Sequence, residues 1–564
     1  MYRVSILALN SKYVHSSLSV WCLYAGIKEY GDKDISCQVI EQTVNNDMHK
    51  VCEEVLATNP DMLGISCYIW NISKVFELVG LLKEAKPDLV ITLGGPEVSY
   101  CQKDVLSKHP EIAYVMSGEG ELPFAQLVNA LKNKTSLDDV LGLTYRQDDE
   151  IIVKKPHIST YEPPTPYTPE FLDSVNKRIV YFETNRGCPF SCDFCLSGRC
   201  GSVHNFDLDN CLENLVKLAN SGTSTIKFVD RTFNANRERS KKIIRFIIEN
   251  TGLRFPRNVC FHFEVAGDIL DDETIDLLVN APKGLFQLEI GMQSFNEKTL
   301  AYINRKTNTT KLKENITRLL MNNNMHVHID LIVGLPLEDM PSFKESFNTG
   351  YMLKAHMIQV GFLKILKGAS MHDNTEKYHY NYHDYPPYEI IDTPWLSAKE
   401  MSEIHYLEDA VERLYNSGRF RYYLDYLLSA TGISPFYLFM RIGKEVNEGI
   451  DYRIDLDDYT KLIYEFGLTL PYVDKMTLRD VLVLDRLATI NTGRLPNCLK
   501  IPNKKSKHYR LMLAKQVPEN KGVKRGMELL YHVDKLVYVD YLNQDPITKR
   551  YQLNFVELAS LQED

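Results

Sequence analysis

Residues 183–195 have the sequence ETNRGCPFSCDFC. They place Cys188, Cys192 and Cys195 in a C-x-x-x-C-x-x-C spacing, directly after an apolar run, Ile179–Phe182, that is typical of a strand. Three thiolates on one short loop can each bind one iron of a 4Fe–4S cluster, which leaves the fourth iron without a protein ligand. An iron with an open coordination position can bind a substrate or cofactor, so this spacing predicts a catalytic cluster.

The same cysteines could instead bind zinc or be ordinary buried thiols. Structural zinc sites usually have four ligands, often as two C-x-x-C pairs. Cys200 is a candidate for the fourth ligand, but it follows Cys195 by five residues, which is a loose fit to that pattern. A disulfide is not expected in a cytosolic chain. The other nine of the 12 cysteines stand singly in apolar or mixed runs, which is typical of buried thiols.

Residues 1–140 alternate short apolar runs with amphipathic helical patterns. Continuous apolar strands separated by helices indicate a parallel sheet covered on both faces, which predicts an α/β, doubly wound (Rossmann-like) domain. Ligands of such sheets bind beyond the carboxyl ends of the strands. There the sequence has glycine-containing or polar loops at 66–68, 94–97 and 117–121. Their glycines either let the backbone approach a flat ligand closely or merely turn the chain from strand to helix.

Residues 141–177 are predicted to form a hairpin followed by a proline-rich linker. From 178 to 371 the chain repeats an apolar strand and a helix six times, which predicts a partial (β/α)6 barrel. Active sites of parallel barrels lie at the carboxyl ends of the strands, and the three cysteines follow the first strand. The last part, 372–564, shows mostly helical patterns.

Charged residues occur at the ends of the predicted barrel strands. Asp230 and Arg231 directly follow the second strand, where buried charges need partners and these two could pair with each other. His262 and Glu264 alternate on the third strand and therefore share one face. Burying an unpaired carboxylate costs several kcal/mol, so Glu264, if it lies inside, should bond to a ligand or a basic group.

The cysteine motif and the order of these strand ends resemble the radical S-adenosylmethionine (radical SAM) superfamily. The loops of residues 1–140, ending in Gly118-Glu119-Gly120-Glu121, resemble the cobalamin-binding domain that precedes many radical SAM domains. The whole chain thus resembles a branch of the cobalamin-dependent radical SAM enzymes with an uncharacterised C-terminal domain. This resemblance implies three cofactors, namely a 4Fe–4S cluster on the three cysteines, S-adenosylmethionine and cobalamin.

The resemblance also implies roles for individual residues. Asp230 would contact the methionine amino group, and Gln293 and Ser294 the ribose and carboxylate. Arg305 could clamp the carboxylate or be a surface residue. The candidates for S-adenosylmethionine are Asp230, Glu264, Gln293, Ser294, Arg305, Ile332 and Gly334, the last two on the strand that resembles the adenine-binding one. The candidates for cobalamin are Ser66, Tyr68, Gly94, Gly95, Pro96, Glu97, Gly118, Glu119 and Gly120.

One departure concerns cobalt. The D-x-H-x-x-G motif, which supplies a histidine ligand in other cobalamin proteins, is absent from this sequence. His15, in the loop after the first strand, could face the cobalt, or it could cap a helix or form a hydrogen bond. We expect no histidine ligand on cobalt.

The function implied by the resemblance is methyl transfer to an unactivated carbon through a 5′-deoxyadenosyl radical and methylcobalamin. One alternative is a rearrangement, cyclisation or redox step without methylation, and another is a non-catalytic cobalamin or redox sensor. The expected partners are a substrate (small molecule, peptide or RNA) and an electron donor such as flavodoxin or ferredoxin.

Composition bears on which partners and which location we expect for the chain. The chain has 564 residues, 44% of them hydrophobic and 25% charged, and a net charge of −9, which disfavours general nucleic-acid binding. Its N-terminus reads as a strand rather than a signal peptide, and no run approaches the roughly 20 apolar residues that span a bilayer. We therefore expect a cytoplasmic protein without membrane contact. The basic stretch 500–525 could meet an anionic substrate or form a solvated loop.

Overall fold

The computed structural model describes residues 1–564 except 200–201, 452, 503–505, 518–523 and 562–564. Cys200 and parts of the basic stretch 500–525 therefore lie outside the described residues. The chain falls into two compact units. The first comprises Met1–Ala266 and Lys364–Ile390, and the second comprises Gly267–Leu363 and Ile391–Asp564.

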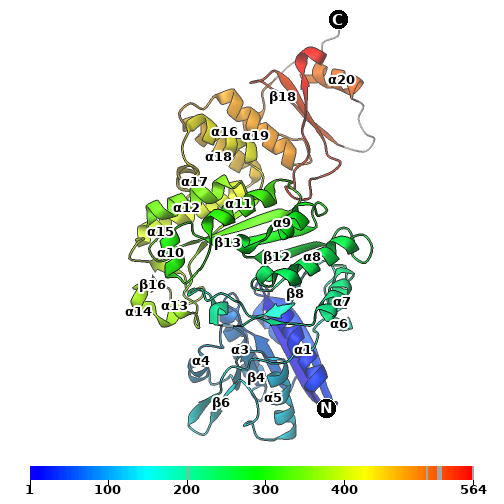
Figure 1. Ribbon diagram of the computed structural model, residues 1–564, viewed down its shortest axis with the longest axis vertical. Coiled ribbons are helices and arrows are strands. Elements are labelled where there is room, and N and C mark those ends of the chain that lie inside the picture. Colours follow the sequence, from blue (N-terminus) through cyan, green and yellow to red (C-terminus); the bar gives the residue numbers. More distant parts are fainter. Residues whose placement is uncertain (200–201, 452, 503–505, 518–523, 562–564) are drawn as a thin grey trace. The chain divides into compact units, whose positions relative to one another are not determined.

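The first unit begins with a seven-stranded sheet in the order β2-β1-β3-β4-β5-β6-β7 (Figure 1). Strands β1 to β5 pair in parallel, whereas β6 is antiparallel to both β5 and β7, so the hairpin predicted after residue 141 forms. The strands are β1 (Tyr2–Asn10), β2 (Ile35–Thr43), β3 (Met62–Ser66), β4 (Val90–Gly94), β5 (Tyr114–Met116), β6 (Leu143–Gln147) and β7 (Glu150–Val153).

Helices cover both faces of this sheet. Leu7 and Leu9 of β1 share a core with α2 and α3, whereas on the other face Phe124 of α5 lies against Gly64 of β3. A Cβ on Gly64 would come within 2.8 Å of that ring, so glycine permits the close approach. The helices are α1 (Leu18–Tyr30), α2 (Met48–Ala57), α3 (Ile72–Ala85), α4 (Gln102–Lys108) and α5 (Glu121–Asn133). The doubly wound fold is confirmed, and the central strands are apolar throughout because both faces are covered.

The six strands predicted for the barrel are divided between the two units. Three of them belong to the first unit, in which β11 pairs in parallel with β8 and with β12. The elements of this part are α6 (Pro169–Ser174), β8 (Ile179–Phe182), β9 (Asn185–Arg186), β10 (His204–Asn205), α7 (Leu208–Ala219), β11 (Thr225–Phe228), α8 (Arg237–Asn250) and β12 (Cys260–Val265). The segment 364–390 adds α13 (Ser370–Asp373), α14 (Thr375–Tyr378) and β16 (Asn381–Tyr382).

The second unit contains the other three strands, of which β14 pairs in parallel with β13 and with β15. Its strand–helix repeats are α9 (Asp272–Val279), β13 (Phe286–Gln293), α10 (Glu297–Tyr302), α11 (Thr309–Leu320), β14 (His326–Val333), α12 (Met340–Met352) and β15 (Met357–Phe362). Helices begin at side-chain caps: Asp271, Asn308 and Asp339 each accept a hydrogen bond from a backbone N–H of the first turn. These repeats confirm the fold class expected for the barrel.

The C-terminal part of the second unit is mainly helical, as predicted, but it ends in a three-stranded antiparallel sheet that the helical patterns did not indicate. Its α-helices are α15 (Ala398–Ala410), α16 (Arg421–Thr431), α17 (Pro435–Ile442), α18 (Leu456–Thr469), α19 (Lys475–Thr489) and α20 (Ser506–Gln516). The strands are β18 (Arg525–Leu530), β19 (Lys535–Asp540) and β20 (Asn554–Glu557).

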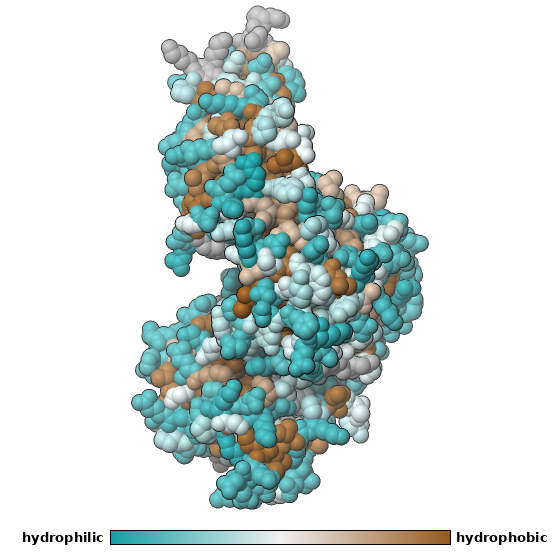
Figure 2. Space-filling model, turned by 90° about the vertical axis from the view of Figure 1, so that its left-hand side faces the viewer, coloured by the Kyte–Doolittle hydropathy of each residue, from teal (hydrophilic) through white to brown (hydrophobic). Residues whose placement is uncertain are grey.

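Hydrophilic residues cover most of the face drawn in Figure 2, and apolar residues form only small separate groups there. Within the described parts of the chain, no helix combines the length and the apolar character needed to cross a membrane.

Candidate functional site

The three cysteines lie in one loop that a short β-ladder closes. Strand β9 before the loop pairs with β10 after it, through Asn185 with Asn205 and Arg186 with His204. Cys188 and Cys192 are buried, Cys195 is half-buried, and none of the three belongs to a disulfide bond. The backbone N–H of Cys195 donates to the carbonyl of Cys192 at 3.1 Å, so the second and third cysteines share one tight turn.

Two glycines make this loop geometry possible. Gly187 has a φ of +98°, and a Cβ there would lie 2.0 Å from the carbonyl oxygen of Ser202. A Cβ on Gly198 would lie 2.7 Å from the carbonyl oxygen of Cys192. Both positions exclude larger residues, since such contacts are closer than any real Cβ makes.

The spacing of the thiols bears on the choice between zinc and a cluster. A zinc–sulfur bond is about 2.3 Å, so three sulfurs on one zinc ion lie within about 4.6 Å of one another. Among the described residues, the group of three metal-ligating side chains whose ligand atoms all fall within 4.8 Å is not the cysteine group but Glu289, His328 and Asp330. The preference for a cluster over a single ion therefore rests on the three-cysteine spacing, which gives one thiolate per iron.

Asp230 is completely buried beneath the cysteine loop. Its carboxylate accepts hydrogen bonds from the backbone N–H of Thr184 at 2.7 Å, the Thr184 hydroxyl at 2.5 Å and the backbone N–H of Asn185 at 3.2 Å. These bonds hold the start of β9. The hydrogen bonds given by the structure thus assign Asp230 a role in shaping the loop, and not the pairing with Arg231 that the sequence also allowed.

The pH dependence of stability should reveal this buried carboxyl. Burial raises the pKa of Asp230 to about 7 from its ordinary value of 3.8, so the folded chain keeps this proton where the unfolded chain has lost it. Its contribution to the free energy of unfolding is therefore greatest below about pH 4 and falls until about pH 7. Asp230→Asn should reduce the change in thermal midpoint between about pH 5 and pH 8, compared with the wild type.

Comparing Asp230→Asn with Asp230→Ala separates the effect of the titrating proton from the effect of the hydrogen bonds. The amide side chain of Asp230→Asn can still accept from the two backbone N–H groups and donate to the Thr184 hydroxyl, whereas Asp230→Ala loses all three bonds. The alanine variant should be destabilised by roughly 1–3 kcal/mol more than the asparagine variant, because buried donors lose their acceptor. An asparagine variant with the full pH dependence of the wild type would contradict the assignment.

Arg186, two residues before Cys188, bonds to three carboxylates. Its guanidinium forms a two-point pair with Glu183, at 3.0 Å for each contact, and reaches Glu119 at 2.8 Å and Glu121 at 2.5 Å. Glu119 lies in the 117–121 segment after β5, and Glu121, the last residue of that segment, begins α5. Burial by itself would lower the pKa of Arg186, but its carboxylate partners outweigh burial and raise that pKa. The cysteine loop and a predicted cobalamin loop are therefore held by the same cation.

A second bridge joins the loop after β1 to β8. The ring of His15 forms a 2.8 Å hydrogen bond with the hydroxyl of Tyr181, and backbone bonds link residues 14 and 16 to Ile179. Burial lowers the pKa of His15, with further lowering by nearby cations. Of the roles the sequence allowed for His15, the structure shows the hydrogen-bonded one.

Glu264 lies half-buried on β12, and a basic group is next to it, as expected for such a carboxylate. The Nζ of Lys227 on β11 lies 4.0 Å from its carboxylate. Lys227 also stands opposite Tyr181 in the register of β11 and β8. Polar side chains from three neighbouring strands thus occupy one face of the sheet.

The predicted cobalamin loops lie at the carboxyl ends of β3, β4 and β5. Ser66 ends β3, and its buried hydroxyl has no hydrogen-bond partner within the part of the chain that the structure describes. An unsatisfied buried hydroxyl costs about 1–3 kcal/mol, which a polar group of a ligand would offset. Next to it, Tyr68 stacks on Trp70 at 4.3 Å, and Trp70 is half exposed. This end of the sheet therefore suits a ligand with both flat and polar parts.

The glycines of these loops are explained by the protein itself. A Cβ on Gly95 would lie 2.5 Å from the Cys67 carbonyl oxygen, and one on Gly118 would lie 2.1 Å from that of His157. Both have positive φ, at +110° and +89°. Gly94 directly precedes Gly95, and Gly120 follows Gly118 by two residues. Pro96, between Gly95 and Glu97, is exposed. Gly95 and Gly118 thus serve backbone packing, a role that was neither of the two considered from the sequence.

Glu97 is buried and bonds to the segment 364–390. The hydroxyl of Tyr388 donates to its carboxylate, and the Nζ of Lys367 lies 4.0 Å away and over the Tyr388 ring. Burial raises the pKa of Glu97. The same segment reaches the cysteine loop, where Asp193 accepts hydrogen bonds from the Met371 backbone N–H at 2.8 Å and the Tyr378 hydroxyl at 3.0 Å. One segment therefore contacts both loops.

Removing the Tyr388 hydroxyl should loosen this segment. In Tyr388→Phe the buried Glu97 carboxylate loses its hydrogen-bond donor, and we expect destabilisation by about 1–3 kcal/mol. Faster limited proteolysis within residues 364–390 would report it. Tyr385→Phe is the matched control, because Tyr385 is 57% exposed. Equal protease resistance of the two variants would show that the bond to Glu97 does not hold the segment.

The remaining candidates lie in the second unit. The hydroxyl of Ser294 is fully buried and donates to Glu338 at 2.5 Å, and Ser346 donates to the same oxygen at 2.9 Å. Burial raises the pKa of Glu338 to about 7. Arg305 donates to the Gly291 carbonyl at 2.5 Å, which places it against the end of β13 rather than on an open surface.

Backbone strain marks the same strand end. Gln293 has a φ of +67°, unusual for a residue with a side chain, at an irregularity in the β13–β14 register. Ile332 is half-buried on β14, and Gly334 follows with a φ of +89°. Gln293 at the end of β13 and Ile332 on β14 thus belong to two adjacent strands, as the predicted order implied.

Three family models match the chain in succession. The B12 binding domain matches residues 4–128, the radical SAM superfamily residues 182–349, and a protein family of unknown function (DUF4080) residues 376–545. The chain therefore carries a cobalamin-binding domain followed by a radical SAM domain, and the resemblance to cobalamin-dependent radical SAM proteins is confirmed.

Individual curated proteins are similar to about half of this chain. The 2-(S-pantetheinyl)-carbapenam-3-carboxylate methyltransferase of Streptantibioticus cattleyicolor is 28% identical over 53% of this chain and 45% of its own length. The anaerobic magnesium-protoporphyrin IX monomethyl ester cyclase of Rubrivivax gelatinosus is 26% identical over 58% of this chain and 60% of its own. The chain thus spans about half the length of these relatives.

A solved structure shows the same fold. The cobalamin-dependent S-adenosylmethionine radical enzyme OxsB, with aqua-cobalamin and S-adenosylmethionine bound, matches with a TM-score of 0.56 and 15% identity. The match covers 86% of this chain and 79% of that one.

Several residues of the site had no role in the sequence analysis. Arg186, Asp193, Tyr388 and Trp70 each contact a loop that the sequence had singled out. Arg186 and Asp193 lie within residues 183–195, so their place in the cysteine motif could have indicated that they belong to the site. No local pattern could have indicated Tyr388, whose partner is 291 residues away.

Proposed function

We propose that this chain is a cobalamin-dependent radical SAM enzyme that transfers a methyl group to an unactivated carbon. The observation that carries the proposal is the Arg186 bridge. A loop with three cysteine thiols and a loop of the B12-binding domain are bonded to one guanidinium, so two cofactors bound there would lie in one unit. Methyl transfer agrees with the activity for which the carbapenam relative is named.

Each group of residues would have a distinct task. Cys188, Cys192 and Cys195 would hold the 4Fe–4S cluster, and Ser66 with the Tyr68–Trp70 pair would face cobalamin. When bound, the cluster, S-adenosylmethionine and cobalamin supply radical and methyl-transfer chemistry that side chains cannot perform. The protein's part is to orient these groups and to exclude water.

The S-adenosylmethionine contacts divide into direct and supporting ones. Glu264, Gln293, Arg305, Ile332 and Gly334 would contact this ligand. Asp230 and Ser294 would act as positioning residues, since their polar atoms already bond to Thr184 and Glu338. Their removal would change the shape of the strand ends.

A second candidate function is a non-methylating reaction, such as a cyclisation. It is favoured by the Rubrivivax gelatinosus relative, which is named as a cyclase. The third candidate, a cobalamin or redox sensor, would leave S-adenosylmethionine intact.

One anaerobic experiment separates the three. The protein is reconstituted with iron, sulfide and cobalamin, reduced, and given S-adenosylmethionine. A methyltransferase should form at least one S-adenosylhomocysteine per bound cobalamin, because bound cobalamin would supply the methyl-transfer chemistry even before a substrate is added. A non-methylating enzyme should form 5′-deoxyadenosine without S-adenosylhomocysteine, and a sensor should form neither.

We further propose a cytoplasmic location and reduction by a flavodoxin or ferredoxin. An oxygen-sensitive cluster suits a reducing compartment, and its chemistry needs one electron at a time. The substrate is a small molecule, a peptide or an RNA, and screening these classes for coupled product formation would identify it.

A further inference from the structure

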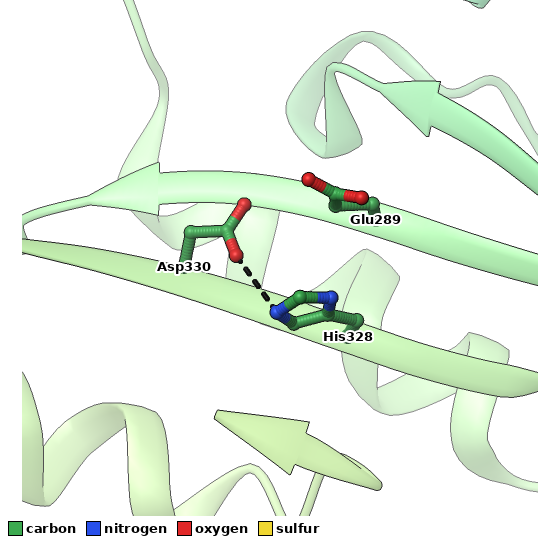
Figure 3. A group of neighbouring side chains, drawn as sticks. All are labelled: Glu289, His328 and Asp330. Carbon is green, nitrogen blue, oxygen red and sulfur yellow. Dashed lines mark ion pairs between the residues drawn. The ribbon is translucent and has the colours of Figure 1, made fainter. Parts of the chain in front are cut away.

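A second group of metal-ligating side chains lies on β13 and β14 of the second unit. Glu289, His328 and Asp330 each offer one ligand atom, and these atoms all lie within 4.8 Å of one another. Figure 3 shows His328 and Asp330 on one strand and Glu289 on its neighbour, with the three side chains gathered together. This group shares no residue with the cysteine loop or with the predicted S-adenosylmethionine contacts.

The strand register brings the three residues together. His328 and Asp330 are two positions apart on β14, so their side chains point to the same face. Glu289 stands directly opposite His328 in the parallel pairing of β13 with β14. Ile329, between His328 and Asp330, and Ile290, directly after Glu289, are buried on the other face of the strands. The arrangement is therefore fixed by regular strands and not by a flexible loop.

The two carboxylates of this group suit a bound cation. Asp330 and Glu289 are only partly exposed, and His328 is buried. Two carboxylates this close in a region of reduced dielectric favour a positive charge beside them, in addition to any other contacts that Glu289 and His328 make. A protonated His328 would supply one charge, whereas a divalent ion would balance both carboxylates and use all three ligand atoms.

The distances suit an ion of octahedral geometry. The Nε2 of His328 lies 2.9 Å from a carboxylate oxygen of Asp330. Two donors about 2.1 Å from an ion and at right angles to each other lie about 3.0 Å apart, so the observed separation serves neighbouring ligands as well as a hydrogen bond. One imidazole with two carboxylates favours transition ions such as Mn²⁺ or Fe²⁺ over Ca²⁺ or Mg²⁺, which prefer oxygen alone.

We propose that Glu289, His328 and Asp330 bind one divalent transition-metal ion, distinct from the iron–sulfur cluster. Three protein ligands leave the other octahedral positions to water or to oxygen atoms of a substrate. The site is therefore of the open kind that can bind and orient an oxygen-rich ligand. This inference does not depend on the proposed methyl transfer.

Titration with Mn²⁺ tests the site in the full-length protein with its cluster assembled. Mn²⁺ prefers oxygen and nitrogen to thiolate, so it avoids the cysteine loop, and the paramagnetic resonance of the free ion reports how much is bound. The wild type should bind one Mn²⁺ per chain. Loss of a residue that only orients a metal ligand already weakens metal binding by about 10–100-fold, so Glu289→Gln and His328→Ala should each weaken it by at least about 100-fold.

Two variants distinguish the loss of a metal ligand from a loss of folding. Glu289→Gln has the same shape as the native residue and is only half-buried, so it should fold even if His328→Ala does not. His326→Ala is the matched control: His326 is two residues before His328 on β14 and pairs with Gln287 as His328 pairs with Glu289. It should bind Mn²⁺ like the wild type. The proposal is overturned if the wild type binds no stoichiometric Mn²⁺, or if Glu289→Gln binds it as tightly as His326→Ala.

Discussion

Cys192→Ala should give a folded protein that binds cobalamin but holds no 4Fe–4S cluster and does not cleave S-adenosylmethionine. Each thiolate of the motif serves one iron, and no neighbouring residue of the tight turn between Cys192 and Cys195 can replace the missing sulfur. Cleavage should fall below detection, because the open iron exists only in an assembled cluster. Iron and sulfide analysis, the optical spectrum and 5′-deoxyadenosine measurement after anaerobic reconstitution would check this.

The control for this variant is Cys52→Ala. Cys52 is also buried and outside any disulfide bond, but it belongs to the core of the seven-stranded sheet. It should keep both the cluster and the cleavage activity. If Cys192→Ala still produced 5′-deoxyadenosine, or if the wild type contained zinc instead of iron, the cluster assignment would be wrong.

The sequence predicted those features that depend on local patterns. The apolar runs of β1, β3 and β4 and the helices between them define a doubly wound sheet, because burial on both faces requires continuous apolar strands. The cysteine spacing likewise depends on one short loop. Both features can be recognised without knowing which distant residues meet.

Contacts between distant segments could not be predicted in this way. Asp230 and Ser294 were predicted to contact a ligand from their places at strand ends, and that prediction stands; the structure adds protein partners, Thr184 and Glu338, that the sequence did not indicate. A buried polar group must find a partner, but its place in the sequence does not say whether that partner is protein or ligand. The bond from Tyr388 to Glu97 likewise joins residues far apart in the sequence, and no local pattern indicates it.

Arg186→Met should be the most damaging single substitution outside the cysteines, since it affects both cofactor loops. The variant leaves Glu119, Glu121 and Glu183 close together with no guanidinium between them. Removing one partner from a buried ion pair typically costs about 3–5 kcal/mol, because the remaining charge is buried and uncompensated. We expect a lower thermal midpoint together with reduced cobalamin and reduced cluster content, whereas Cys192→Ala should lower the cluster alone.

Two further variants identify the cause. Arg254→Met is the matched control: Arg254 pairs with Glu213 at 3.1 Å, but both side chains are exposed, so the cost should be only about 0–1 kcal/mol. Arg186→Lys keeps the charge but loses the fork that reaches three carboxylates, and it should recover only part of the stability. If Arg186→Met retained both cofactors and unfolded at the same temperature as Arg254→Met, the shared guanidinium would not be what joins the two loops, and the cobalamin-binding and radical SAM domains would have to be coupled through His15 and the segment 364–390 instead.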